Sequence, residues 1–142
     1  MKIAVIGSRE FRYSDFVRNE VYRYFKHAIF PLAVFDDGPP VVFLSGGARG
    51  VDTWAEEEID QLNKQNASSK ILQIVKDVKY PDKTDFDKIP YHAKVERYYA
   101  RNRQIVEQSD ILLVFWDGKS GGTKQGIEYA IQLGKVLNIY IR

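Results

Sequence analysis

The sequence predicts an α/β fold, a Rossmann-like three-layer sandwich with a mainly parallel sheet of about five strands. Short apolar runs alternate with helix-like stretches along the whole chain, and three of these runs end in glycine-rich turns. The 142 residues, 44% hydrophobic and 28% charged, are enough for one globular domain with its own core. We therefore expect a single domain over residues 1–142.

The first half of the chain supplies two strands and two helices. Its continuous apolar runs are typical of buried parallel strands. Apolar residues at helical spacing follow Ser14, which predicts a helix start there. Residues 31–40 are rich in proline and indicate a turn-rich connection, which could carry a short extended piece at 32–35. The predicted elements of this half are strands at 2–6 and 41–44 and helices from residue 14 and over 51–66.

The second half repeats the alternation of strands and helices. Residues 76–91 show little pattern, and loops of this length in compact domains are commonly functional or mobile, so this stretch is a candidate lid. Gly134 predicts the end of the last helix. The predicted elements of this half are strands at 71–75, 111–116 and 136–141 and helices over 92–109 and from 123 to 134.

Glycine-rich turns follow the strands at 2–6, 41–44 and 111–116. The carboxyl ends of parallel strands share one edge of a sheet, and ligands bind where the strand order reverses. Helix starts there offer unpaired amides, and glycines let an anion approach the main chain. The turns therefore predict a phosphate-binding cleft. Its candidate residues are Gly7, Ser8, Arg9, Ser45, Gly46, Gly47, Ala48, Arg49, Gly50, Asp117, Gly118, Gly121, Gly122 and Thr123.

These residues also have simpler explanations. The glycines can serve the geometry of tight turns alone, Arg49 can be a surface residue, and Asp117 can shape its turn rather than bind a ribose hydroxyl. Asp52 is expected to offset helix amides, or alternatively to orient Arg49. Two known phosphate motifs are absent, because Ser45 interrupts G-x-G-x-x-G and no G-x-x-x-x-G-K-[ST] occurs.

The composition narrows the functional classes. The net charge of +2 is too even to imply nucleic acid or an anionic membrane by itself. The absence of cysteine excludes disulfides and cysteine nucleophiles. Neither a Ser/His/Asp arrangement nor a metal-ligand spacing is present, so we expect no metal and no cofactor. The first apolar run is too short for a signal peptide and no stretch approaches a membrane helix, so we expect a cytoplasmic protein.

Four segments of the chain carry a family resemblance, namely Gly7-Ser8-Arg9, Ser45 to Asp52, Arg101-Asn102 with Ser109-Asp110, and Gly121-Gly122-Thr123. They resemble the SLOG superfamily, a Rossmann-like group that includes the DNA-processing protein DprA and the LOG phosphoribohydrolases. The resemblance spans nearly the whole chain and implies a nucleotide or nucleotide-derived ligand. It adds Arg101 and Asn102 to the candidate ligand-binding residues, although Arg101 can equally lie on the solvated side of a helix.

The chain departs from the hydrolases of that group at the last turn. The LOG hydrolases and the similar deoxyribosyltransferases carry a glutamate at the position that Gly126 occupies here. Glu128 lies two residues later, which is about 200° around a helix, so it points away from that position. We therefore expect no vigorous catalysis. An enzyme that cleaves an N-glycosidic bond would need another carboxylate, with Glu10, Asp117 or Glu128 as candidates.

The sequence thus favours a protein that binds a nucleotide or nucleotide-derived molecule as a sensor or carrier. Two alternatives stay open. One is an enzyme that cleaves a nucleotide N-glycosidic bond. The other is a DprA-like binder of single-stranded nucleic acid, for which Arg9, Arg12 and Arg49 would form a local basic edge. No membrane partner is expected, and a homo-oligomer is compatible with the sequence.

Overall fold

The computed structural model describes residues 1–34, 40–70 and 72–142. It contains a five-stranded sheet with the strand order β3-β2-β1-β4-β5, in which every neighbouring pair is parallel. This is the Rossmann-like α/β architecture that the alternating pattern predicts. The strands are β1 (Lys2–Gly7), β2 (Val42–Ser45), β3 (Val75–Val78), β4 (Ile111–Trp116) and β5 (Val136–Ile141).

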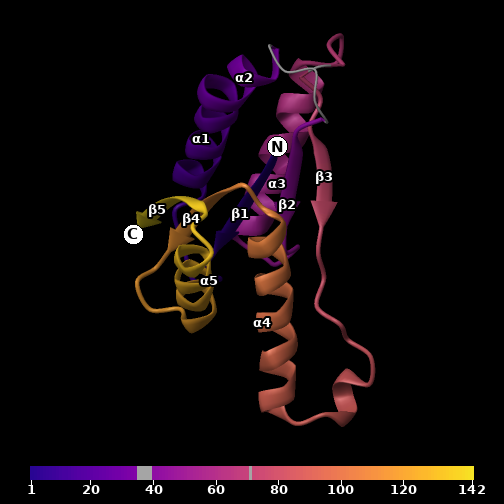
Figure 1. The fold of residues 1–142 in the computed structure, drawn as a ribbon, viewed down its shortest axis with the longest axis vertical. Coiled ribbons are helices and arrows are strands. Elements are labelled where there is room, and N and C mark those ends of the chain that lie inside the picture. Colours follow the sequence, from indigo (N-terminus) through magenta and orange to yellow (C-terminus); the bar gives the residue numbers. More distant parts are fainter. Residues whose placement is uncertain (35–39, 71) are drawn as a thin grey trace.

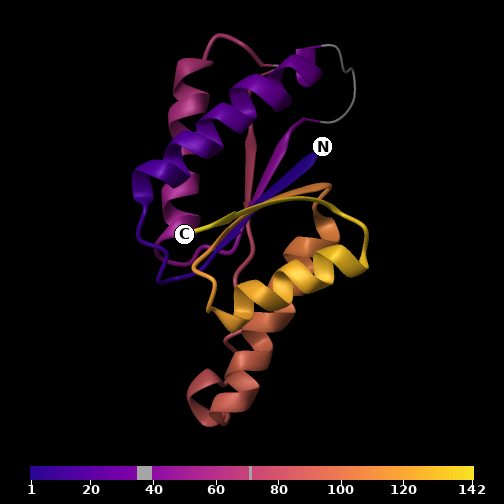
Figure 2. The same cartoon turned by 90° about the vertical axis from the view of Figure 1, so that its left-hand side faces the viewer.

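Helices cover both faces of the sheet, as Figures 1 and 2 show from two directions. α1 packs with α3 on one face, and α4 packs with α5 on the other. The long helices are α1 (Ser14–Tyr24), α3 (Val51–Gln65), α4 (Tyr91–Gln108) and α5 (Gly121–Gln132), and the short ones are the π-helix η1 (Phe25–Ile29), α2 (Phe30–Val34) and the 3₁₀ helix η2 (Phe86–Lys88).

The two faces of the sheet are buried in two separate apolar clusters. Val5 and Phe115 belong to the cluster that contains residues of α1 and α3, whereas Ala4 and Val114 belong to the one that contains residues of α4 and α5. Alternate residues of β1 and β4 therefore enter opposite clusters. This explains why their sequences are continuously apolar rather than alternating.

β1 lies at the centre of the sheet, between β2 and β4. The chain builds β2 and β3 on one side of β1 and then crosses to build β4 and β5 on the other. The strand order therefore reverses at the carboxyl end of β1. Gly7 ends β1, and a Cβ there would lie 2.5 Å from Val51 Cβ, so only glycine lets α3 start this close to the strand.

Two predictions about individual elements are wrong. The third strand, expected at 71–75, is β3 at Val75–Val78, so the prediction is wrong for 72–74 and the stretch 76–91 begins in a strand. Residue 71 lies outside the described residues. The side chain of Asn63 in α3 donates to the carbonyl of Ile74 at 2.9 Å and accepts from its amide at 2.8 Å. These bonds occupy the backbone groups that a strand at this position would pair with the sheet.

The extended piece expected at 32–35 is also wrong for residues 32–34, which are helical in α2. Residue 35 lies outside the described residues. The helix that begins at Ser14 continues through η1 into α2 instead of stopping before the connection. Pro31 stands inside this continuous helical stretch, directly after the π-helix η1, and has no N–H to donate there.

α4 extends well beyond the sheet. Its N-terminal half projects away from the body of the molecule, and the segment 79–90 runs beside it (Figure 1). Only Arg101, Ile105 and Val106 of this helix are fully buried, all in its C-terminal half. Within the described parts of the chain, no helix is both long and apolar enough to cross a membrane.

Candidate functional site

A cleft of about 1320 Å³ lies where the turns after β1, β2 and β4 meet α4. The candidate residues in its lining are Gly7, Arg9, Gly46, Ala48, Arg101, Asn102, Asp117, Gly122 and Thr123. The candidates that lie outside the lining are Ser8, Ser45, Gly47, Arg49, Gly50, Gly118 and Gly121. The glycine turns therefore share one edge, although not every residue in them reaches the cleft.

Basic side chains dominate the charged part of the lining. We call the lining residues Arg9, Arg12, Lys94, Arg101, Lys119 and Arg142 the cleft cations. Among the described residues, none of them belongs to an ion pair, since the ion pairs found there use other lysines and arginines. The charge of these side chains is therefore available to an anionic ligand, except for that of Arg101, which is buried. The acidic residues of the lining are Glu10, Asp52 and Asp117.

Aromatic rings are interleaved with the cleft cations. They come from the β1–α1 turn, from η2 and from the projecting half of α4. Tyr91 at the start of α4 is 80% exposed and Tyr13 is 56% exposed, so both offer ring faces to solvent or to a ligand. The aromatic residues of the lining are Tyr13, Phe86, Tyr91, Tyr98 and Tyr99.

The turn between β4 and α5 is held by its own side chains. The Asp117 carboxylate accepts hydrogen bonds from the amides of Ser120 at 2.8 Å and Lys119 at 2.9 Å. Burial opposes the effect, but these two amides hold the pKa of Asp117 below its ordinary value. Asp117 therefore shapes the turn, which is the simpler of its two sequence interpretations.

A chain of hydroxyl groups fixes the start of α5 against β1. Ser8 donates to Thr123 Oγ1 at 3.3 Å, and Thr123 donates to Ser120 Oγ at 3.4 Å. Ser8 also accepts from the amide of Asp117 at 3.2 Å and is only 1% exposed, so its role is to support the turn from beneath. The first-turn amides of α5, at residues 121–123, have no carbonyl partner inside the helix and face this edge.

The turn between β2 and α3 is organised differently. Ser45 Oγ accepts from the amide of Gly47 at 3.2 Å, and Asp52 Oδ2 accepts from the amide of Ala48 at 3.1 Å. Thr53 donates to the carbonyl of Ala48 at 2.9 Å. The Ala48 amide, which the sequence predicts to bind a ligand phosphate, thus already donates to the Asp52 carboxylate of the protein.

The exposed part of this turn lies outside the cleft. Gly47 and Gly50 have positive φ angles of 68° and 82°, which favour glycine, and Tyr80 packs closely over Gly47. The Arg49 side chain is exposed and does not reach the lining. The local basic edge expected from the sequence therefore retains Arg9 and Arg12 in the cleft, with Arg49 beside it.

Arg101 crosses from α4 to the ends of two strands. Its Nη1 donates to the carbonyl of Gly46 at 2.5 Å and to that of Lys79 at 3.5 Å, and its Nε donates to Asn102 Oδ1 at 2.9 Å. It is 8% exposed, which rules out the solvated position considered from the sequence. Burial lowers the pKa of Arg101, and the nearby Asp52 carboxylate opposes that shift.

The ring of Tyr98 makes cation–π contacts with two arginine side chains. The Arg9 guanidinium lies 5.2 Å from the centre of its ring and that of Arg101 lies 5.7 Å away. Cation–π contacts of this kind hold a guanidinium in place without neutralising it. Arg9 is itself exposed, so it presents a positioned positive charge to the cleft.

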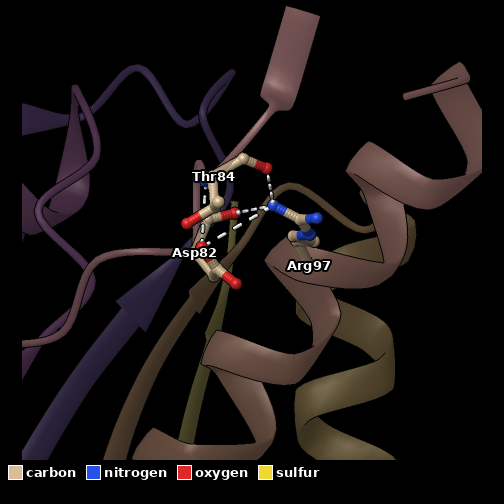
Figure 3. A network of polar contacts seen from close by, with 3 residues as sticks. All are labelled: Asp82, Thr84 and Arg97. Atoms are coloured by element: carbon tan, nitrogen blue, oxygen red, sulfur yellow. Dashed lines mark hydrogen bonds and ion pairs between the residues drawn. The ribbon is translucent and has the colours of Figure 1, made fainter. Parts of the chain in front are cut away.

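Segment 79–90, part of the candidate lid, contributes Phe86 to the cleft wall and is bonded to α4 through Arg97. Arg97 donates to the carbonyl of Asp82 at 3.0 Å and to that of Thr84 at 2.5 Å, and its guanidinium lies 3.6 Å from the Asp82 carboxylate (Figure 3). Phe86 in the same segment meets Tyr98 edge to face at 5.8 Å. The segment is thereby positioned to present Phe86 to the cleft.

The structure also locates the carboxylates considered for catalysis. Gly126 is buried, and a Cβ there would lie 3.1 Å from Ile6 Cδ1 at the floor. Glu128 points outward, is 63% exposed and lies 3.9 Å from Lys124. Glu10 reaches the lining. Among the described residues, no group of three His, Cys, Asp or Glu side chains could hold a metal ion.

Several lining residues do not appear among the sequence candidates. Lys94, Lys119 and Arg142 are single basic residues in unrelated stretches, and Phe86 and Tyr91 lie in or next to the stretch with little pattern. Phe86, Tyr91 and Lys94 share one signal, which is that basic and aromatic residues cluster between residues 79 and 103, whereas Lys119 and Arg142 lie outside that stretch. That clustering could have indicated a ligand surface on the third long helix.

The fold and the cleft together define the class of the molecule. It is a doubly wound parallel α/β domain whose basic and aromatic cleft lies at the reversal of strand order. No family model matches the chain, and no curated protein matches it. A similar solved structure is that of DNA processing protein A from Helicobacter pylori, a protein described for its single-stranded DNA binding mode.

That similarity shows the fold. The TM-score is 0.56 and the sequence identity 24%, and the match covers 98% of this chain but only 64% of the other. This chain thus spans less than two thirds of the Helicobacter protein. It shares its Rossmann-like architecture with a protein of the DprA kind, which is the fold that the resemblance to the SLOG superfamily implies.

Proposed function

We propose that the cleft binds single-stranded nucleic acid. One observation carries the proposal: the cleft cations, none of them in an ion pair within the described residues, alternate with aromatic rings along one surface. A positively charged groove that follows the backbone, together with rings on which bases stack, is the usual construction of a single-strand site.

Different parts of the cleft suit different parts of the ligand. Arg9, Lys119 and the first-turn amides of α5 lie at the sheet edge, where they can bind backbone phosphates. Tyr91 and Tyr13 are exposed rings that can stack on bases, which extends the site along α4. The near-neutral charge of the whole chain does not oppose this, because six of its 21 basic residues line the cleft against three acidic residues.

The comparison supports the same function. DNA processing protein A from Helicobacter pylori, which shares the fold, is described for binding single-stranded DNA. We also propose that this chain is a small member of the SLOG superfamily. The turns at Gly7, Gly46 and Gly122 line the cleft of the observed fold, which supports that assignment.

The test is a salt titration of binding. A fluorescent oligothymidine of about 15 nucleotides is titrated with protein, and anisotropy gives the affinity at several salt concentrations. We expect log K to fall linearly with log salt. The double variant Arg9→Gln, Lys119→Gln removes two phosphate contacts, so the slope should become shallower by about 1.4, which is twice the single-strand value of about 0.7.

A matched control separates the cleft from overall charge. The variant Arg23→Gln, Lys124→Gln removes two cations whose side chains are 69% and 63% exposed and lie outside the lining. It should leave the slope within about 0.3 of the unmodified protein. Equal losses for both double variants would place binding elsewhere, and equal affinity for a duplex of the same length would exclude a single-strand site.

A mononucleotide is the second candidate ligand. The observation that favours it is that two helices, α3 and α5, begin at glycine turns on the same edge, which suits one phosphate group. Competition separates the two candidates. If the site is made for a mononucleotide, a nucleoside monophosphate will displace the oligonucleotide at a concentration comparable to the oligonucleotide's own Kd. If the site follows a strand, displacement will need at least about 100-fold more.

A further inference from the structure

The carboxylate of Asp52 lies at the floor of the cleft, where an anionic group of a ligand is expected to bind. It is the second residue of α3, it lines the cleft, and yet it is only 7% exposed. Its Oδ2 accepts a hydrogen bond from the amide of Ala48 at 3.1 Å. In a glycine turn that leads into a helix, such an amide is one that a phosphate oxygen would otherwise take.

Charged groups surround Asp52, so its ionisation changes the net charge that a ligand meets in the cleft. Arg101 from α4 and Arg9 from the β1–α1 turn face it with positive charge, and Glu56 on α3 faces it with negative charge. Gly46 lies between the carboxylate and Arg101. A Cβ at Gly46 would be 3.0 Å from Asp52 Oδ2 and 2.9 Å from Arg101 Nη1. An ionised Asp52 therefore offsets part of the positive charge that an anion would meet.

The protonation state of Asp52 also changes with pH near neutrality. Burial raises the pKa of this carboxyl to about 6, against the hydrogen bond from Ala48 and the attraction of Arg101, which both act to lower it. Asp52 is therefore mostly ionised at neutral pH and mostly protonated at about pH 5.

We propose that binding of a phosphodiester chain in the cleft is coupled to the uptake of one proton by Asp52. This inference rests on the proposed function. A phosphate that approaches the floor repels the ionised carboxylate, so the complex favours the neutral carboxyl group. One proton passes from the buffer to an Asp52 oxygen as the O–H bond forms. The neutral group can then donate to a phosphate oxygen, and the Ala48 amide becomes available to the ligand.

The first test measures affinity against pH. The probe is an oligothymidine without terminal phosphate, because its phosphodiesters and bases keep their charge between about pH 5 and 8. At constant ionic strength, we expect binding about 10-fold weaker at the upper end of this range than at the lower end. Asp52→Asn, which is neutral and of the same shape, should bind equally well across the range, with the affinity that the unmodified protein has near pH 5.

A matched carboxylate serves as the control. Glu56 lies one turn further along α3, and burial raises its pKa too, but it is not part of the lining. Glu56→Gln should therefore keep the pH dependence of the unmodified protein. If Glu56→Gln removes the pH dependence of binding and Asp52→Asn retains it, the proton binds to Glu56 rather than to Asp52 and the proposal is overturned.

A second measurement needs no variant. Calorimetric titration at about pH 7 in two buffers of different ionisation enthalpy gives the number of protons taken up per oligonucleotide, and we expect about 0.4, the value for a carboxyl group whose pKa rises by about one unit on binding. Zero uptake with tight binding would overturn the coupling while leaving the proposed function intact. Absence of binding at every pH would overturn the proposed function, and the coupling with it.

Discussion

The buried carboxyl of Asp52 should make the stability of the free protein depend on pH. Its pKa rises from 3.8 to about 6 on folding, chiefly because burial penalises the charged form. Each unit of pKa is about 1.36 kcal/mol, so ionising Asp52 in the folded protein costs about 3 kcal/mol of unfolding free energy. That is a large share of the about 5 to 15 kcal/mol by which domains are stable.

The sign follows from proton binding. Between the unfolded and folded pKa values, the folded protein holds more protons than the unfolded chain. The contribution of Asp52 is therefore fully present below about pH 4 and is lost as the pH rises through about 6. Asp52→Asn cannot ionise, so the variant should be more stable than the unmodified protein by about 3 kcal/mol at about pH 8. The two should converge near pH 4.

Urea unfolding of both proteins at several pH values measures this difference. Burial also raises the pKa of Glu56 and Glu58, so both proteins will lose stability as pH rises, and only the difference between the two curves isolates Asp52. Equal m-values are required for the comparison. Parallel curves with a constant gap would refute the reasoning, because a constant gap means that Asp52 binds protons equally in both states.

Three further predictions concern other parts of the molecule. Gly7→Ala places a Cβ 2.5 Å from Val51 Cβ and should lower the unfolding free energy by about 1 to 3 kcal/mol, as measured by urea unfolding; Gly7→Ala, Val51→Ala should not recover the loss, because alanine keeps the Cβ at residue 51. Arg97→Ala should speed amide hydrogen exchange between residues 82 and 88, whereas Arg103→Ala, which breaks only a pair with Glu96 on α4, should not. Nucleoside monophosphates incubated with the protein should release no base above the uncatalysed control by chromatography; turnover at about 1 s⁻¹ would contradict this.

The sequence predicts the fold well because the fold depends on local patterns. Continuous apolar runs, helical spacing and glycine turns each lie within about 15 residues, and together they define a parallel sheet with helices on both faces. The third strand is misplaced because its position depends on Asn63, which binds the backbone of Ile74 from α3. Such a contact joins residues that the local pattern treats separately.

The site is predicted only in part, for the same reason. The glycine-rich composition of the turns at Gly7, Gly46 and Gly122 predicts them from sequence, and these glycines line the cleft. Arg142 and Lys94 are ordinary basic residues in sequence, and they become lining residues only through the topology and the projection of α4. Arg49 shows the reverse case, since a basic residue within a glycine turn is exposed beside the cleft.

The carboxylates of the cleft bear on what it can do beyond binding. Cleavage of an N-glycosidic bond needs a carboxylate that is free to stabilise positive charge or activate water. Asp117 is held by the amides of Ser120 and Lys119, and Asp52 is held by the amide of Ala48. Both therefore serve the turns that surround the ligand. Glu10 is the remaining acidic residue of the lining, so any base release would have to depend on it, and Glu10→Gln is the variant that would abolish such release.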